Sequence, residues 1–283
     1  MKKPTLAVAE LLRPRNMAIS FLGVIAGMLL VSETITLTFG TFAAAFSAAL
    51  ILGGGNALND YYDYETDRIN RPKRPLSSGL IRREKAKQIA ILFFVAGILL
   101  AVSINIYCLL LAIVNTAVLS AYAKYSKKAL LISNLAVSYL SASVFIYGAA
   151  SIIETQLFSL RGAGMLAVLA GSSFFMTTSR EIIKDIEDVK GDARIKADTL
   201  PIRLGANGAN AIAILAGLMA IAISMTPFLT QTAGFNKTAY ALFITPANLI
   251  FISSYLTNPA KSQKRIVAGM LASLLAFMAG RLA

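Results

Sequence analysis

Two clusters of aspartate with the same spacing stand out in a chain that is otherwise mostly apolar. Both read D-x2-D-x3-D, in "NDYYDYETD" and in "DIEDVKGD", and they lie 125 residues apart. The sequence has no histidine and a single cysteine, Cys108, so a metal bound at these clusters would have oxygen ligands only. Mg²⁺ suits such a ligand set best, followed by Mn²⁺ or Ca²⁺. The candidate ligands are Asn59, Asp63 and Asp67 in the first cluster and Asp185, Asp188 and Asp192 in the second.

The spacing of these residues predicts two acidic stripes. Residues four apart on a helix lie about 40° apart around its axis, so Asn59, Asp63 and Asp67 align and Asp60 flanks them. The second stripe, which begins at Glu181, forms if its helix continues past the membrane edge. Such carboxylates repel one another unless cations lie between them, and Mg²⁺ readily shares its ligand shell with phosphates. Two facing stripes therefore predict a cradle for a metal-bound diphosphate. Acids that merely form solvated loop ends are the alternative, which the repeated spacing disfavours.

Basic and polar residues near the clusters could complement a diphosphate. Arginine binds phosphate in bidentate fashion and lysine acts as a point charge. Tyr122, at the end of the predicted fourth span, and Lys127, just after it, are candidate catalytic residues, together with Asp60, Asp63 and Asp188. The candidates for substrate binding are Asn59, Arg13, Arg71, Arg74, Lys127, Asn134 and Lys184.

The composition predicts an all-α integral membrane protein. Of the 283 residues, 57% are hydrophobic and 14% are charged, and the mean hydropathy is +0.67. Apolar runs of about 17 to 25 residues can span a bilayer, and they predict nine transmembrane helices. These lie at 16–32, 37–58, 87–105, 107–123, 132–151, 163–179, 206–226, 238–256 and 266–282. One acidic cluster follows the second span, and the other follows the sixth.

The distribution of charge predicts the orientation of the chain. If the N-terminus is cytoplasmic, 24 of the 27 basic residues fall in the inside segments, as the positive-inside rule requires. Both acidic clusters then lie on the cytoplasmic side of the cell membrane. The net charge of +13 is explained by topology, and we expect no nucleic-acid partner and no obligatory protein partner.

The offset between the clusters equals four predicted helices. It favours two quasi-equivalent four-helix units plus a ninth helix, within one domain over residues 1–283. The segments that carry the two motifs are expected near residues 56–85 and 180–205.

These motifs together resemble the intramembrane UbiA-type prenyltransferases. The resemblance covers nearly the whole chain and includes "NDYYDYETD", "DIEDVKGD" and the connecting "YAKYSKKALLISN". It implies metal and diphosphate ligands in both motifs and a site for a prenyl diphosphate near Tyr122, Lys127 and Asn134. It also implies that Arg13 matches a basic residue at the first helix.

Within this superfamily, "DRINRPKRPLSSG" and "REIIKDIEDVKGDARIKADTLPIRLG" look most like the archaeal members that form the second ether bond of membrane lipids. One departure is "RPLSSG", where such enzymes often read Arg-Pro-Ile-Pro-Ser-Gly. The resemblance implies Mg²⁺-dependent transfer of a geranylgeranyl group from geranylgeranyl diphosphate to the sn-2 hydroxyl of geranylgeranylglyceryl phosphate.

Two alternatives remain. A member of the same family could prenylate an aromatic acceptor of the quinone precursor, homogentisate or chlorophyllide type. A cation or phosphate transporter is disfavoured, because it would carry its acids near the middle of its spans.

Overall fold

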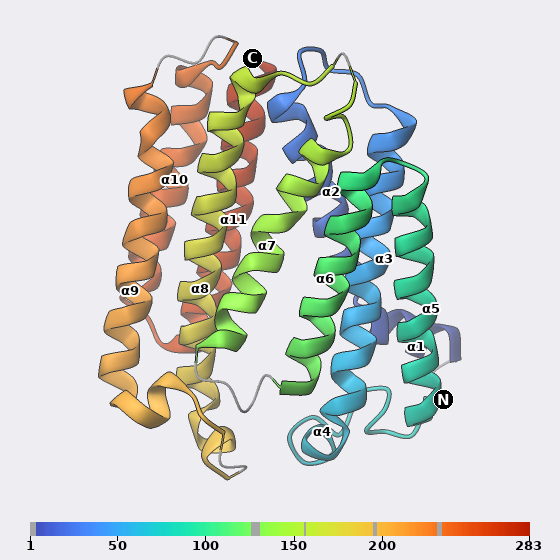
Figure 1. Cartoon of the computed structure of the whole chain (residues 1–283). Coiled ribbons are helices and arrows are strands. Elements are labelled where there is room, and N and C mark those ends of the chain that lie inside the picture. The colour runs from blue at the N-terminus through green and yellow to red at the C-terminus, as the bar shows by residue number, and fades with distance from the viewer. Residues whose placement is uncertain (1–3, 126–130, 156, 195–196, 231–233) are drawn as a thin grey trace.

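The chain folds into a bundle of helices, seen in a computed structural model (Figure 1). The structure describes residues 4–125, 131–155, 157–194, 197–230 and 234–283. Within these ranges we find helices, a short 3-10 turn at Leu160–Gly162 and one isolated β-bridge between Ser32 and Phe158. The helices are α1 (Pro4–Leu12), α2 (Pro14–Val31), α3 (Phe39–Tyr62), α4 (Tyr64–Asn70), α5 (Arg83–Val102), α6 (Ile106–Tyr125), α7 (Ile132–Ala150), α8 (Ala163–Arg194), α9 (Leu200–Leu229), α10 (Lys237–Ser254) and α11 (Pro259–Leu282).

Seven helices in the described part of the chain are long and apolar enough to cross a membrane. They are α2, α3, α5, α6, α7, α9 and α11. The all-α, multi-pass membrane fold is therefore confirmed, whereas the number of nine spans stays a prediction. Helix α8 runs alongside the others (Figure 1) but is less apolar, because charged residues such as Arg180, Lys184 and Asp188 follow its apolar first half.

Local sequence explains where several helices begin. The side chains of Thr38, Asn236 and Asn258 accept hydrogen bonds from backbone N–H groups at the starts of α3, α10 and α11. Such caps satisfy donors that the first turn of a helix leaves unpaired. Pro14 and Pro259 occupy the first turns of α2 and α11, where a missing N–H costs nothing.

Helices α2 and α7 approach each other closely and join the two sides of the bundle. A Cβ atom on Gly148 would lie 1.8 Å from the carbonyl oxygen of Val24, and one on Gly27 would lie 1.9 Å from that of Phe145. Only glycine permits this approach of two backbones. On one side of the contact α3 packs against α2 and α5, and on the other side α8 packs against α7 and α9.

The two acidic motifs lie at the same end of the bundle, near the N-terminus and opposite the C-terminus (Figure 1). Helix α8 continues through the second motif to Arg194, which meets the condition for the second stripe. The first motif differs from the prediction of one unbroken stripe. Helix α3 ends at Tyr62, and Asp63 separates it from the short helix α4.

Candidate active site

A cavity of about 1130 Å³ opens at the acidic end of the bundle and extends between the helices. Both acidic motifs contribute to its lining, although 125 residues separate them in the sequence. All six predicted metal ligands are among the lining residues: Asn59, Asp63, Asp67, Asp185, Asp188 and Asp192. The structure thus brings together the two oxygen-rich groups that the repeated spacing predicts.

The first motif is ordered by contacts across the interruption between α3 and α4. The amide of Asn59 donates a hydrogen bond to Asp63 Oδ2 at 2.9 Å. Asp67 is buried in α4 and forms an ion pair with Arg74. The guanidinium of Arg83 stacks on Tyr61, with its carbon 4.6 Å from the ring centroid, and donates to the Tyr61 carbonyl at 3.1 Å. Residues beyond the motif therefore hold its carboxylates in place.

Asp60, predicted as catalytic, has a different environment from its neighbours. Its side chain is buried, and it is not among the residues that line the cavity. Its Oδ1 accepts hydrogen bonds from Arg13 at 2.6 Å and from Arg74 at 3.2 Å. Both arginines line the cavity, as sequence reasoning expects of residues that bind substrate, and so does Arg71, which is exposed.

The second motif lies on α8 beyond its apolar part and is braced by α7. Asn134 donates its amide hydrogen to Asp185 Oδ2 at 2.8 Å. Burial raises the pKa of Asp185 to about 6, against the opposing effects of the Asn134 hydrogen bond and the nearby Lys184. Loss of solvation penalises the ionised carboxylate, and a cation placed beside it would offset that penalty.

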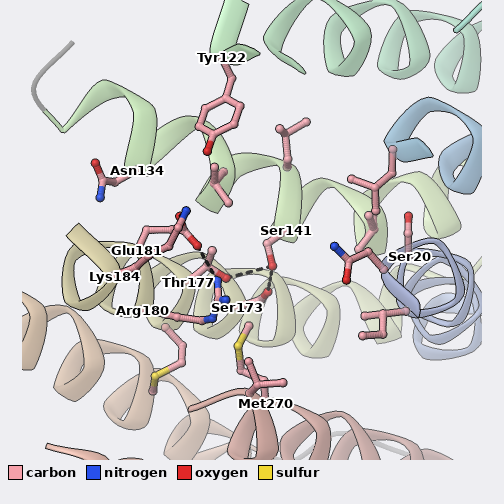
Figure 2. A pocket seen from close by; sticks show the side chains of 18 of the residues that line it. Ser20, Tyr122, Asn134, Ser141, Ser173, Thr177, Arg180, Glu181, Lys184 and Met270 are labelled. Carbon is pink, nitrogen blue, oxygen red and sulfur yellow. Dashed lines mark hydrogen bonds and ion pairs between the residues drawn. The ribbon is translucent and has the colours of Figure 1, made fainter. Parts of the chain in front are cut away.

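A buried carboxylate that sequence reasoning did not select lies beside this motif. Glu181 is 6% exposed and pairs with Arg180 at 2.5 Å and with Lys184 at 3.1 Å. Figure 2 shows the three side chains together on the cavity wall. The Glu181 carboxylate raises the pKa of Lys184 and keeps it protonated. The signal for Glu181 was its position four residues before Asp185 on the same stripe.

Tyr122 enters the cavity from α6, opposite the second motif. Its hydroxyl points toward the region of Glu181 and Lys184 (Figure 2). Lys127, predicted as both catalytic and substrate-binding, lies outside the described residues. The remaining sequence candidates thus lie around one opening, with Asn134 and Lys184 on the side of the second motif.

The donor atoms of the site fit Mg²⁺ if a substrate completes its ligand shell. Among the residues described, no three histidine, cysteine or carboxylate side chains are close enough to hold a metal ion by themselves. The oxygen ligands are instead distributed over α3, α4 and α8 around the same cavity. Mg²⁺ is commonly bound by one or two carboxylates together with substrate phosphates, and this arrangement suits that mode.

Farther from the mouth, apolar side chains line the cavity. They include Ile51, Leu119, Val144, Leu169 and Phe277. The hydroxyl groups of Ser141, Ser173 and Thr177 bond one another at 2.8 and 3.0 Å (Figure 2). These hydroxyls satisfy one another, and the apolar side chains around them provide most of a surface on which a hydrocarbon chain can lie.

Comparison with known proteins identifies the family. Residues 20–279 match the UbiA prenyltransferase family. The chain is 39% identical over 236 residues to digeranylgeranylglyceryl phosphate synthase of Methanosarcina mazei, covering 82% of this chain and 78% of that protein. It is 37% identical over 281 residues to the protein of that name from Methanopyrus kandleri, covering 98% and 99%.

Solved structures agree with this likeness. One solved structure superposes on this chain with a TM-score of 0.79 at 29% identity, and the superposition covers 99% of each chain. It is described as giving structural and mechanistic insights into the biosynthesis of digeranylgeranylglyceryl phosphate synthase in membranes. A UbiA homologue from Archaeoglobus fulgidus, solved with GPP and Mg²⁺, has the same fold, with a TM-score of 0.69 at 15% identity, covering 98% of this chain and all of that one. With the family matched over most of its length and its motifs gathered around one cavity, the chain belongs to the UbiA prenyltransferase family.

Proposed function

We propose that this protein transfers a geranylgeranyl group from geranylgeranyl diphosphate to the sn-2 hydroxyl of geranylgeranylglyceryl phosphate. One observation carries the proposal: two acidic motifs from distant parts of the chain line the charged mouth of a cavity whose deeper walls are mostly, though not entirely, apolar. Such a cavity suits a substrate with a diphosphate at one end and a long hydrocarbon at the other. The relatives named digeranylgeranylglyceryl phosphate synthase support this choice of acceptor.

The bound metal would be Mg²⁺, held by Asn59, Asp63 and Asp67 from one side and by Asp185, Asp188 and Asp192 from the other. It would neutralise the diphosphate and make it a better leaving group. Support comes from the all-oxygen ligand set and from the related protein that was solved with a prenyl diphosphate and Mg²⁺.

The protein's own side chains would act on the diphosphate and on the allylic carbon. Lys184 and Arg180 lie beside the second motif and can donate to phosphate oxygens. Tyr122 would shield positive charge at C1 of the prenyl group with the face of its ring. As the bond from C1 to the diphosphate oxygen breaks, the acceptor hydroxyl forms the new C–O bond at C1 and gives up its proton to a carboxylate of the site or to the departing diphosphate. The apolar walls would exclude water, which would otherwise capture the prenyl group.

The mouth of the cavity would open to the cytoplasm from the cell membrane. Basic residues concentrate in the segments at the end of the bundle that carries the two acidic motifs. Cytoplasmic loops of membrane proteins show the same enrichment in lysine and arginine. Both lipid substrates would then enter from the bilayer and place their phosphorylated ends at the mouth.

Purified protein in bilayer nanodiscs, supplied with labelled geranylgeranyl diphosphate, tests the proposed reaction. The expected product with geranylgeranylglyceryl phosphate is the diether, formed with Mg²⁺ and abolished by EDTA. A parallel reaction receives 4-hydroxybenzoate, an aromatic quinone precursor, and should form no prenylated product. Transfer to the aromatic acid alone would refute the lipid acceptor and leave the family chemistry intact.

A further inference from the structure

Two arginines at the cavity share one buried carboxylate. Arg13 Nη2 and Arg74 Nη1 both donate to Asp60 Oδ1, at 2.6 and 3.2 Å. Asp60 is 4% exposed and does not line the cavity, whereas both arginines do. The Asp60 carboxylate therefore faces the two arginines and holds their guanidinium groups in position on the cavity wall.

The backbone at Arg13 is shaped to make this contact. Arg13 lies at the break between α1 and α2 in the left-handed region, with φ 56° and ψ 70°, which residues other than glycine rarely adopt. Asn56 holds the break to α3, because its amide donates to the Leu12 carbonyl at 3.0 Å and its oxygen accepts from Arg13 at 3.3 Å. Such conformations persist only where the surroundings enforce them, and they are frequent at functional sites.

Arg74 remains hydrogen-bonded to Asp60 even if a metal ion binds the Asp67 carboxylate. It bonds Asp67 and Asp60 through the same nitrogen, Nη1, out of the five N–H donors that a guanidinium carries. If the Asp67 carboxylate turns to a metal ion, Asp60 still holds Arg74 on the wall. The two arginines can therefore present planar donor groups to an anion whether or not metal is bound, and such groups match phosphate oxygens in bidentate fashion.

The proposed reaction requires two anion sites, because the donor carries a diphosphate and the acceptor carries a phosphate monoester. We propose that Arg13 and Arg74 form a metal-independent subsite for the phosphate of the acceptor and that Asp60 is its positioning residue. This inference rests on the proposed function. It gives Asp60 a role different from that of Asp63 and Asp67, although all three belong to one motif.

Binding without metal tests the subsite directly. Labelled geranylgeranylglyceryl phosphate is added in EDTA to the full-length protein in nanodiscs, as wild type and as Asp60→Asn. Wild type should bind, and Asp60→Asn should bind about tenfold to a hundredfold more weakly, the loss expected for one or two charge-assisted hydrogen bonds. If Asp60 acted only through its negative charge, removing that charge would strengthen binding of an anion. Unchanged or tighter binding by the variant, or no metal-free binding by wild type, would overturn the proposal.

Further variants separate positioning from general damage. Arg74→Gln should weaken binding to a similar degree and serves if Asp60→Asn does not fold. Arg68→Gln is the matched control, since Arg68 is exposed and forms a long ion pair of 3.8 Å with the exposed Glu65. The phosphate-free analogue geranylgeranylglycerol should bind wild type and Asp60→Asn equally, and a selective loss of the analogue would refute the role.

Steady-state kinetics give a second readout. The KM for the acceptor should rise in Asp60→Asn by the same factor as the binding constant, while the KM for the donor stays within about twofold. A rise in the donor KM instead would assign Asp60 to the diphosphate site. Because the binding assay needs no turnover, absence of transfer in wild type would count against the proposed function without deciding the subsite.

Discussion

At the scale of single residues, Asp63 and Asp188 are the sharpest test of the metal site, because they line the cavity from the junction of α3 and α4 and from α8. Asp63→Asn and Asp188→Asn each exchange a negatively charged ligand for a weaker neutral one. We expect each to raise the Mg²⁺ concentration for half-maximal prenyl transfer at least about tenfold, as loss of one ligand or its support usually does. Titration of activity with Mg²⁺ measures this.

The control for these variants is Glu65→Gln, which removes the same charge from an exposed side chain in the segment of the first motif. It should leave the Mg²⁺ dependence unchanged. If both aspartate variants kept the wild-type Mg²⁺ dependence and full activity, the diphosphate cradle would be wrong.

The role of a residue can be predicted from the sequence when it depends on neighbours along the chain, and not when it depends on contacts between distant segments. The candidate ligands were found because carboxylate spacing in a chain without histidine carries information by itself. Glu181 was missed as a site residue, because its burial appears only when α8 is packed, although its partners Arg180 and Lys184 are neighbours on the same helix. The contact of Asp60 with Arg13 spans 47 positions in the chain, which no motif spacing reports.

At the scale of elements, the crossing of α2 and α7 has no room for a side chain. Gly148→Ala would place Cβ 1.8 Å from the Val24 carbonyl oxygen, so the two helices must separate. Overpacking of this kind costs about 1–3 kcal/mol or more. We expect a clearly lower thermal unfolding midpoint in detergent and reduced prenyl transfer, since both helices contribute residues to the cavity.

Gly171→Ala in α8 is the matched control for that substitution. A Cβ there would meet its nearest neighbour, Ile223, at an ordinary 3.7 Å, and alanine favours helix over glycine. Its unfolding midpoint should be equal to or higher than that of wild type. Equal midpoints for the two variants would contradict the close approach of α2 and α7.

The elements also show which features a one-dimensional pattern can predict. The spacing of the acids on α8 predicts a stripe on condition that the helix continues past its apolar run, and α8 does continue to Arg194. The interruption of α3 at Asp63 could not be predicted from spacing, because Arg74 ties Asp60 to Asp67 across it and Arg83 stacks on Tyr61 and Tyr64 on both sides. These contacts come from residues beyond the motif, and helical spacing takes no account of them.

At the scale of the whole molecule, the orientation in the membrane decides which compartment the cavity faces. The loop between α2 and α3 lies at the end of the bundle opposite α4 (Figure 1). The positive-inside rule predicts that α4 is cytoplasmic and this loop external. Cysteine labelling can test this, because the chain has one native cysteine, the buried Cys108, which Cys108→Ala removes.

On that background, Glu65→Cys and Thr36→Cys place single thiols at exposed positions on opposite ends. A membrane-impermeant maleimide should label Thr36→Cys in right-side-out vesicles and Glu65→Cys in inverted vesicles. Both should react after permeabilisation, which controls for accessibility. The reverse pattern would put the acidic mouth outside the cell, where the basic segments should not lie, and would overturn the proposed cytoplasmic site. Labelling of both positions from one side would imply an even number of crossings between them and contradict α3 as a membrane span.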